Sequence, residues 1–144
     1  MNRLEVLSAD LAAQLHRATI AKRRAACLAA CEVAVAEAEI EHPLVDKALQ
    51  QLRTGHVFTS EEKAEIDALT EQLDEQYFES QEAAEKGKAT YADYSGDFAK
   101  ARAVAALSFA GSDSSEDADA IYEAAAAVGD DKREFFAKIE SALK

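Results

Sequence analysis

Alanine is the commonest residue of this chain, and residues that break helices are almost absent. The sequence holds 33 alanines against 12 valines and isoleucines, with one proline and five glycines among 144 residues. Alanine is the best helix former, whereas the β-branched residues that favour strands are scarce. With so few turn residues, the elements must be long. The chain is therefore predicted to be all-α.

Apolar spacing and capping residues divide the chain into five to six predicted helices. The first is expected over about Arg3–Glu39, and the second from Pro43 to a cap at Gly55. The third is expected to begin at a capping box formed by Thr59 and Glu62 and to end near Gly87. The fourth is expected over about Lys88–Ala110. Ser114 or Ser115 is expected to cap a fifth helix that reaches Val128, and a short last helix carries Phe135 to Leu143.

Two apolar stripes lie on opposite sides of the predicted first helix. Leu4, Leu7, Leu11, Leu15 and Ala18 make one stripe, and Ile20, Cys27, Cys31, Val35 and Ala38 make the other. The stripes change sides at Lys22-Arg23-Arg24, where the helix either breaks or packs on different sides at its two ends. Since no breaker lies between Thr19 and Ala26, we expect one long, unbroken N-terminal helix.

The second half of the predicted fourth helix is apolar on all sides. Its aromatic stripe continues from Tyr91 to Phe109, and Val104, Ala106 and Leu107 cover the other faces. A helix that is apolar all round is buried. Residues 99–110, in the helix near residues 88–110, are therefore expected at the centre of a bundle that forms a single domain over residues 1–144.

The net charge of −12 lies entirely in the later part of the chain. Residues 1–60 carry seven acidic and seven basic residues, whereas residues 61–144 carry 21 acidic and nine basic residues. Such a charge repels nucleic acid and anionic membranes and attracts basic partners. The alternative is that the charge serves solubility alone.

The predicted third helix carries the densest acidic face, and it is our candidate partner-binding surface. The candidate residues are Glu71, Asp74, Glu75, Phe78, Glu79 and Glu82. Like charges four residues apart repel each other, and a basic partner would turn that cost into attraction. The alternative is a solvated face without a partner.

Phe78 lies about 120° from the apolar stripe of the third helix and has acidic neighbours. An aromatic residue ringed by carboxylates is suited to anchoring a partner, because aromatics carry binding energy and rim charges steer association. The alternative is that a neighbouring helix covers Phe78, and burial above about nine-tenths would exclude an exposed anchor.

No residue pattern in the chain indicates catalysis, a metal or a cofactor. Glu39 and His42 match one half of a di-iron motif, but such sites need a second unit. Cys27 and Cys31 are read as reduced core residues, and Arg102 is expected to form a structural ion pair. Lys22, Arg23 and Arg24 are expected to face the acidic later helices. We therefore predict a non-enzymatic, cytoplasmic protein without signal peptide, membrane span or cofactor.

Two segments resemble the opening of small all-helical immunity proteins of bacterial polymorphic-toxin systems. The first is Arg23-Arg24-Ala25-Ala26-Cys27-Leu28-Ala29-Ala30-Cys31-Glu32, and the second runs from His42-Pro43-Leu44-Val45 through Ala48-Leu49-Gln50-Gln51-Leu52-Arg53-Thr54-Gly55. Together they cover about a third of the chain, mostly at core positions. The resemblance implies a cytoplasmic inhibitor of a cognate toxin domain, often a nuclease with a basic active-site face. It assigns no binding residue.

The sequence thus favours an immunity protein that occludes a basic toxin through an acidic surface, acting as a monomer or weak homodimer. The alternative is a helical scaffold or adaptor protein without enzymatic activity, dimerising through an apolar face of the first helix. A small helical enzyme or metal carrier is a third possibility, but no convergent pair of titratable groups can be placed for it.

Overall fold

The computed structural model describes residues 2–144, and within that range it contains helices and no strands. The helices are α1 (Arg3–Leu7), α2 (Ala9–Arg17), α3 (Ile20–Ala38), α4 (Pro43–Arg53), α5 (Ser60–Glu85), α6 (Tyr91–Ala110), the 3-10 turn η1 (Ser114–Glu116), α7 (Asp117–Val128) and α8 (Arg133–Leu143). The all-α prediction is confirmed. The predicted five to six helices were too few, because the N-terminal segment is divided.

The prediction of one unbroken helix over Arg3–Glu39 was wrong, since the chain breaks at Ser8 and again at Thr19. The side chain of Ser8 accepts a hydrogen bond from the Leu11 backbone N–H, and that of Thr19 accepts one from Lys22. Hydroxyl residues that cap a helix in this way compete with its continuation. Each break turns the chain, so that Leu4, Leu11 and Leu15 of the first stripe are buried, as are Cys27, Cys31 and Ala38 of the second.

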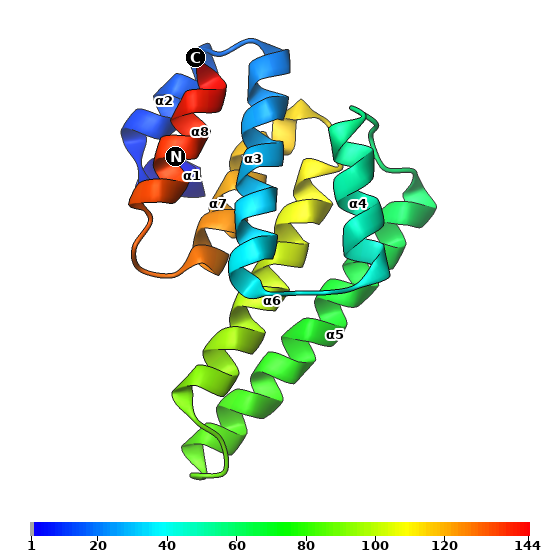
Figure 1. Cartoon of the computed structure of the whole chain (residues 1–144), viewed down its shortest axis with the longest axis vertical. Helices are drawn as coiled ribbons and strands as arrows, with labels where there is room; N and C mark the ends of the chain where they lie inside the picture. Colours follow the sequence, from blue (N-terminus) through cyan, green and yellow to red (C-terminus); the bar gives the residue numbers. More distant parts are fainter. Residues whose placement is uncertain (1) are drawn as a thin grey trace.

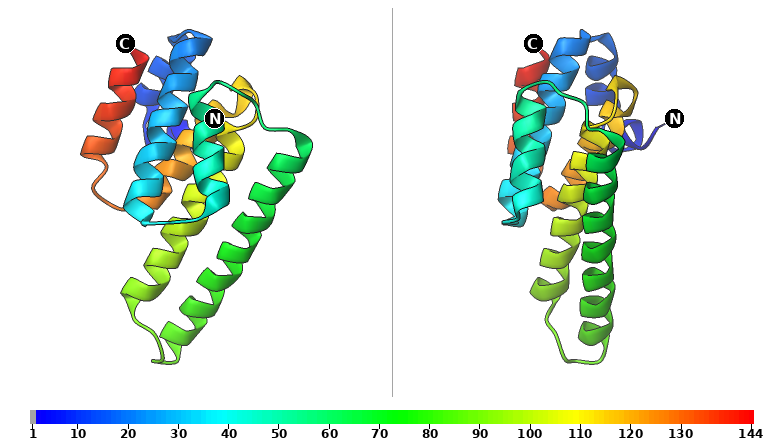
Figure 2. Two further views of the ribbon diagram at one scale, coloured as in Figure 1. Left: turned by 45° about the vertical axis from the view of Figure 1, so that its right-hand side comes forward. Right: turned by 90° about the vertical axis from the view of Figure 1, so that its right-hand side faces the viewer.

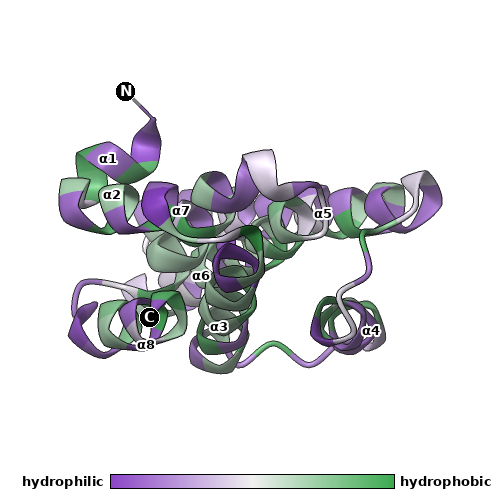
Figure 3. Ribbon diagram, turned by 90° about the horizontal axis from the view of Figure 1, so that it is seen from above, coloured by the Kyte–Doolittle hydropathy of each residue, from purple (hydrophilic) through white to green (hydrophobic). Residues whose placement is uncertain are grey.

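Seen end-on, the helices form two rows with α6 between them (Figure 3). One row holds α1, α2, α7 and α5, and the other holds α8, α3 and α4. Residues Ala101–Ala110 of α6 are buried except Arg102 and Phe109, which confirms the predicted central element for this half of the helix. The helix begins at Tyr91 rather than near Lys88, and its residues 91–100 are exposed or half-buried, so the prediction of burial near residues 88–110 was wrong for the first half. Alanines on the facing helices permit this close packing, because interaxial distance depends on side-chain size. These alanines include Ala26, Ala30 and Ala34 of α3 and Ala120 and Ala124 of α7.

Capping boxes begin both helices of the long α5–α6 pair. At α5, Thr59 accepts from the Glu62 backbone N–H and Glu62 accepts from that of Thr59, which confirms the predicted box. Thr90 and Asp93 form the same arrangement at α6. In each box the hydrogen bond from the threonine backbone N–H holds the pKa of the acid below its ordinary value. Two local signals therefore set where this helix pair begins and where it reverses.

The α6–α7 connection differs in detail from the prediction. Asp113, rather than Ser114 or Ser115, supplies the cap, and its carboxylate accepts from the Ser115 backbone N–H at 2.9 Å. Residues 114–116 form the short 3-10 turn, and α7 begins at Asp117 without a side-chain cap. Aspartate and serine are both favourable N-cap residues, so the sequence alone did not show which of them would cap this turn.

The far halves of α5 and α6 project beyond the other helices as a two-helix arm (Figures 1 and 2). We define the arm as residues 74–100, and every residue in it is exposed or half-buried. The remaining described residues form the body, in which both chain ends lie (Figure 1). The arm is only two helices thick, so its outer faces have no neighbour within the described chain.

Among residues 2–144, no helix combines the length and the apolar character that crossing a membrane requires.

Candidate protein-binding surface

The predicted partner-binding residues lie along the outer face of α5, from the end of the body onto the arm. Five of them, Glu71, Glu75, Phe78, Glu79 and Glu82, are exposed, and Asp74 is half-buried. The opposite face of α5 buries Ile66, Leu69 and Leu73. Spacings of three and four residues place the apolar side chains on one face of α5, against α6. The acidic side chains therefore lie on the opposite face and point outward.

Phe78 is 61% exposed, so no neighbouring helix covers it. Its ring touches that of Tyr77, with the ring centres 5.4 Å apart. A phenylalanine this exposed gains little stability from burial, and an isolated one would need no explanation. Phe78 is not isolated, because it ends a continuous set of aromatic rings.

Half of the chain's phenylalanines and tyrosines lie in the arm. Tyr77 sits at the centre of the set, 5.2 Å from Phe98 and 6.4 Å from Tyr94. Tyr94 in turn packs edge-on against Tyr91, which is 71% exposed. The rings thus cross the arm from α5 to α6, and both ends of the set are open to solvent. Aromatic side chains are enriched where proteins bind one another.

The carboxylates of the candidate surface differ in what they contact. Glu71, Glu75 and Glu79 form no ion pair with any described residue. Glu82 forms an exposed pair with Lys86 at 3.0 Å, of the kind that contributes little to stability. Asp74 is already bound, because its Oδ1 lies 2.7 Å from Arg102. The outward negative charge available to a partner is therefore carried mainly by Glu71, Glu75 and Glu79.

Arg102 forms the ion pair that the sequence predicted. It joins Asp74 of α5 to Glu123 of α7, with a second contact of 2.9 Å. Glu123 is buried and also accepts from Arg3 of α1 at 2.8 Å. Arg3 reaches Asp119 as well, at 3.2 Å. This network ties four helices together where the arm leaves the body, so it fixes the direction of α5.

The basic residues Lys22, Arg23 and Arg24 do not neutralise the acidic face of α5. Arg24 pairs with buried Asp117 at 2.5 Å, and Lys22 donates to the Lys144 carbonyl at 2.7 Å. Asp117 belongs to α7 and Lys144 is the C-cap of α8, so Arg24 and Lys22 face later helices as expected. Of the three bases, Arg24 alone forms an ion pair with a described acid. Among the predicted partner-binding residues, only Asp74 forms an ion pair with a described residue of another helix.

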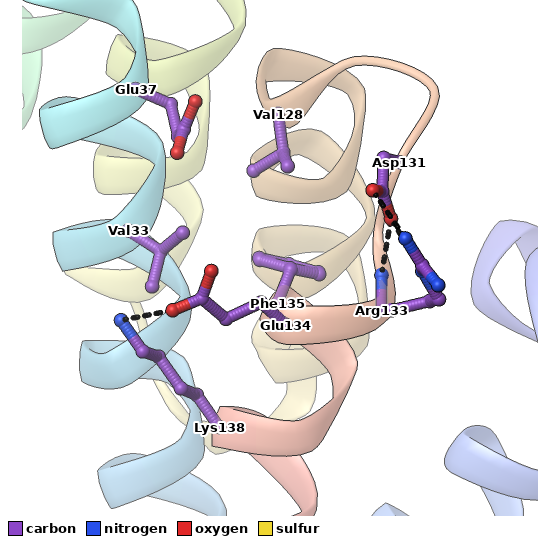
Figure 4. Close-up of a pocket in the computed structure, with 8 residues that line it drawn as sticks. All are labelled: Val33, Glu37, Val128, Asp131, Arg133, Glu134, Phe135 and Lys138. Carbon is purple, nitrogen blue, oxygen red and sulfur yellow. Dashed lines mark hydrogen bonds and ion pairs between the residues drawn. The ribbon is translucent and has the colours of Figure 1, made fainter.

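A groove of about 580 Å³ lies between α3, the end of α7 and α8 (Figure 4). Val33, Val128 and Phe135 line its apolar part, and its other lining residues are Glu37, Asp131, Arg133, Glu134 and Lys138. Most of these charges pair within the groove, Arg133 with Asp131 at 3.0 Å and Lys138 with Glu134 at 3.9 Å. The hydrogen bond from Arg133 lowers the pKa of Asp131. The charges are thus matched locally and converge on no reacting position.

The remaining candidates for chemistry have structural roles. Cys27 and Cys31 are free thiols in the core, and burial raises the pKa of Cys31 to about 12. Such thiols stay protonated and are poor nucleophiles. His42 caps α4, since its Nδ1 accepts from the Leu44 backbone N–H at 3.1 Å. Within residues 2–144 no group of three potential metal ligands comes together.

Two features of the structure were not predicted from the sequence. Tyr91 was placed in the apolar stripe of its helix, but it is exposed at the arm's end. Arg3 was not singled out, although it binds Glu123 and lies over the Tyr122 ring at 4.5 Å. The aromatic density of residues 77–98 was a signal for the first feature. Nothing in sequence spacing brings α1 beside α7.

No protein-family model matches this chain, and no curated protein or solved structure is significantly similar to it.

Proposed function

We propose that this protein is an inhibitory binding protein, an immunity protein that occludes a basic toxin domain, and that the arm is its docking surface. The observation that carries the proposal is the exposed Phe78 beside three carboxylates with no ion pair in the described chain. An aromatic anchor supplies binding energy, and the surrounding charges steer a cationic partner toward it.

The position of the arm supports this proposal. A toxin domain is blocked when a rigid body covers its active face, and the arm presents a surface that body helices leave free. The network of Arg102, Asp74 and Glu123 holds the arm's base in one direction. A surface that is fixed before binding loses less conformational freedom when the complex forms.

The first experiment identifies and measures the partner. Where a gene beside this one encodes a secreted protein with a variable C-terminal domain, that domain is expressed with this chain and purified as a complex. Association rates are then measured by stopped flow over a range of salt concentrations. Reversing Glu71, Glu75, Glu79 and Glu82 to lysine is expected to slow association about tenfold or more at low salt and to flatten its salt dependence.

A body variant provides the matched control. Reversal of Glu37, Glu41, Asp130 and Glu134, all exposed body acids, changes the net charge by the same amount. It is expected to slow association much less than reversal of Glu71, Glu75, Glu79 and Glu82 on the outer face of α5 does. Equal effects of the two variants would assign the attraction to overall charge and would remove the arm from the proposal.

A further inference from the structure

The chain carries one five-residue pattern twice, on two different helices. The pattern is an acid, two residues of any kind, an aromatic residue and a second acid. It occurs at Asp119–Tyr122–Glu123 of α7 and at Glu75–Phe78–Glu79 of α5, and no other aromatic residue of the chain has acids in both positions. On a helix the residues at i, i+3 and i+4 share one face, so each set forms a compact triad.

The triad on α7 binds an arginine. Arg3 places Nη1 2.8 Å from Glu123 and Nη2 3.2 Å from Asp119, and its guanidinium carbon lies 4.5 Å from the centre of the Tyr122 ring. A second ring, that of Phe109, lies 5.9 Å from the same carbon. One planar guanidinium thus meets two carboxylates and the face of an aromatic ring at once.

The triad on α5 has the same spacing, and no described cation occupies it. Phe78 is 61% exposed, and neither Glu75 nor Glu79 forms an ion pair with a described residue. The ring of Tyr77 lies beside that of Phe78, with ring centres 5.4 Å apart, and the Arg3 site likewise has a second ring, that of Phe109, 5.9 Å from the guanidinium carbon. Both sites therefore combine two carboxylates with two nearby rings.

We propose that Glu75, Phe78 and Glu79 form an arginine-binding triad, and that a basic protein partner inserts an arginine there as Arg3 inserts within the chain. This inference rests on the proposed function of the arm and adds the identity of the partner's contact residue. Arginine is favoured over lysine because its guanidinium is planar and weakly hydrated. A lysine ammonium can meet the carboxylates but keeps more of its hydration.

The test compares two peptides of equal charge, acetylated and amidated hexa-arginine and hexa-lysine, titrated into the full chain at low salt and followed by NMR. The wild-type chain is expected to bind the arginine peptide about two- to fivefold more tightly, as an exposed cation–π contact predicts. Phe78→Leu keeps every charge and removes the ring. This variant is expected to lower the affinity for hexa-arginine to that for hexa-lysine and to leave the affinity for hexa-lysine unchanged.

Tyr91→Leu is the matched control, because it removes an exposed arm ring without acids in these positions. It should leave the preference for arginine intact. Circular dichroism verifies that both variants keep their helicity. Equal affinity of the wild-type chain for the two peptides, or equal weakening of both by Phe78→Leu, overturns the triad.

The double variant Glu75→Gln with Glu79→Gln separates this inference from the proposed function. If both peptides bind equally and both lose affinity in this variant, the arm attracts cations but has no arginine site. If neither peptide binds the wild-type chain, the triad and the acidic docking surface fail together. A loss of arginine preference in this variant, combined with the Phe78→Leu result, supports the triad.

Discussion

Helix α6 passes through two different environments, and the contrast between them separates folding from binding in this protein. Its second half, Ala101–Ala110, lies among α3, α5 and α7 and is almost entirely buried. Its first half, residues 91–100, runs beside α5 in the arm and has no buried residue (Figure 1). The body uses alanines and close helix contacts, whereas the arm uses aromatic rings that reach across two helices.

This difference indicates which side chains the fold requires. In the body, removal of a buried group leaves a cavity that neighbours fill only in part. In the arm, the exposed ends of the aromatic set contact few neighbours, so their removal should leave the fold intact. Residues that stability does not need, gathered on one surface with unpaired carboxylates, are suited to contact with a partner.

The largest expected effect contrasts two phenylalanines. Phe135 of α8 is 1% exposed, whereas Phe78 of the arm is 61% exposed. Phe135→Ala is expected to lower the free energy of unfolding by about 3–5 kcal/mol. Phe78→Ala should change it by less than about 0.5 kcal/mol, as surface substitutions usually do. Urea denaturation followed by circular dichroism measures both, and a loss of several kcal/mol at Phe78 would show that the ring serves the fold.

Two glycines of the same helix pair sharpen the contrast at intermediate size. A Cβ at Gly111 would overlap the ring of Phe58, which packs directly over that backbone, whereas a Cβ at Gly96 meets nothing. Gly111→Ala should therefore destabilise the chain by about 1–3 kcal/mol. Gly96→Ala should stabilise it by about 0.5–1 kcal/mol, because alanine is the better helix former. Thermal unfolding of the two variants gives the signs, and equal signs would contradict this contrast.

The last contrast concerns how stability depends on pH at the two capping boxes. The pKa values of Glu62 and Asp93 are lower in the folded chain than their ordinary values of 4.5 and 3.8. Their contribution to stability is therefore complete above those ordinary values and is lost as the pH falls through the lowered ones. Thr90→Ala removes the cap at the arm's tip, at a cost of about 1 kcal/mol at neutral pH.

Thr90→Ala should also weaken the pH dependence of stability, because Asp93 loses the Thr90 hydroxyl, which accepts a hydrogen bond from the Asp93 backbone N–H. NMR titration of the Asp93 and Glu62 carboxyl groups follows both boxes. The expected result is a higher pKa for Asp93 and an unchanged pKa for Glu62. A shift of both would show that the two ends of the helix pair are coupled.

Much of this fold follows from local signals in the sequence. Alanine content predicted the helical class, and the apolar residues on all sides of the segment 99–110 predicted the central helix. The capping box at Thr59 was recognised because Glu62 stands at the required spacing. The break at Thr19 was missed, since Thr19 was treated as neutral in a helix and its capping role depends on the extended backbone there.

The candidate surface was only partly predictable. Helical periodicity placed the acids and Phe78 on the outer face of α5, but it could not show that α5 leaves the body halfway along its length. Where α5 leaves the body depends on which other helices extend alongside it, and contacts between segments distant in sequence determine their positions. The same limit explains Asp74, whose partner Arg102 lies 28 residues away on another helix.

The arm, and the Glu75–Phe78–Glu79 face in particular, is proposed to receive a cationic partner. Backbone amide shifts of the full chain, recorded while hexa-arginine is added at low salt, test it most directly. The shifts are expected to concentrate between residues 71 and 82, with little change in the body helices α3, α7 and α8. Shifts spread evenly over all exposed acids, or centred on the groove beside α8, would contradict it.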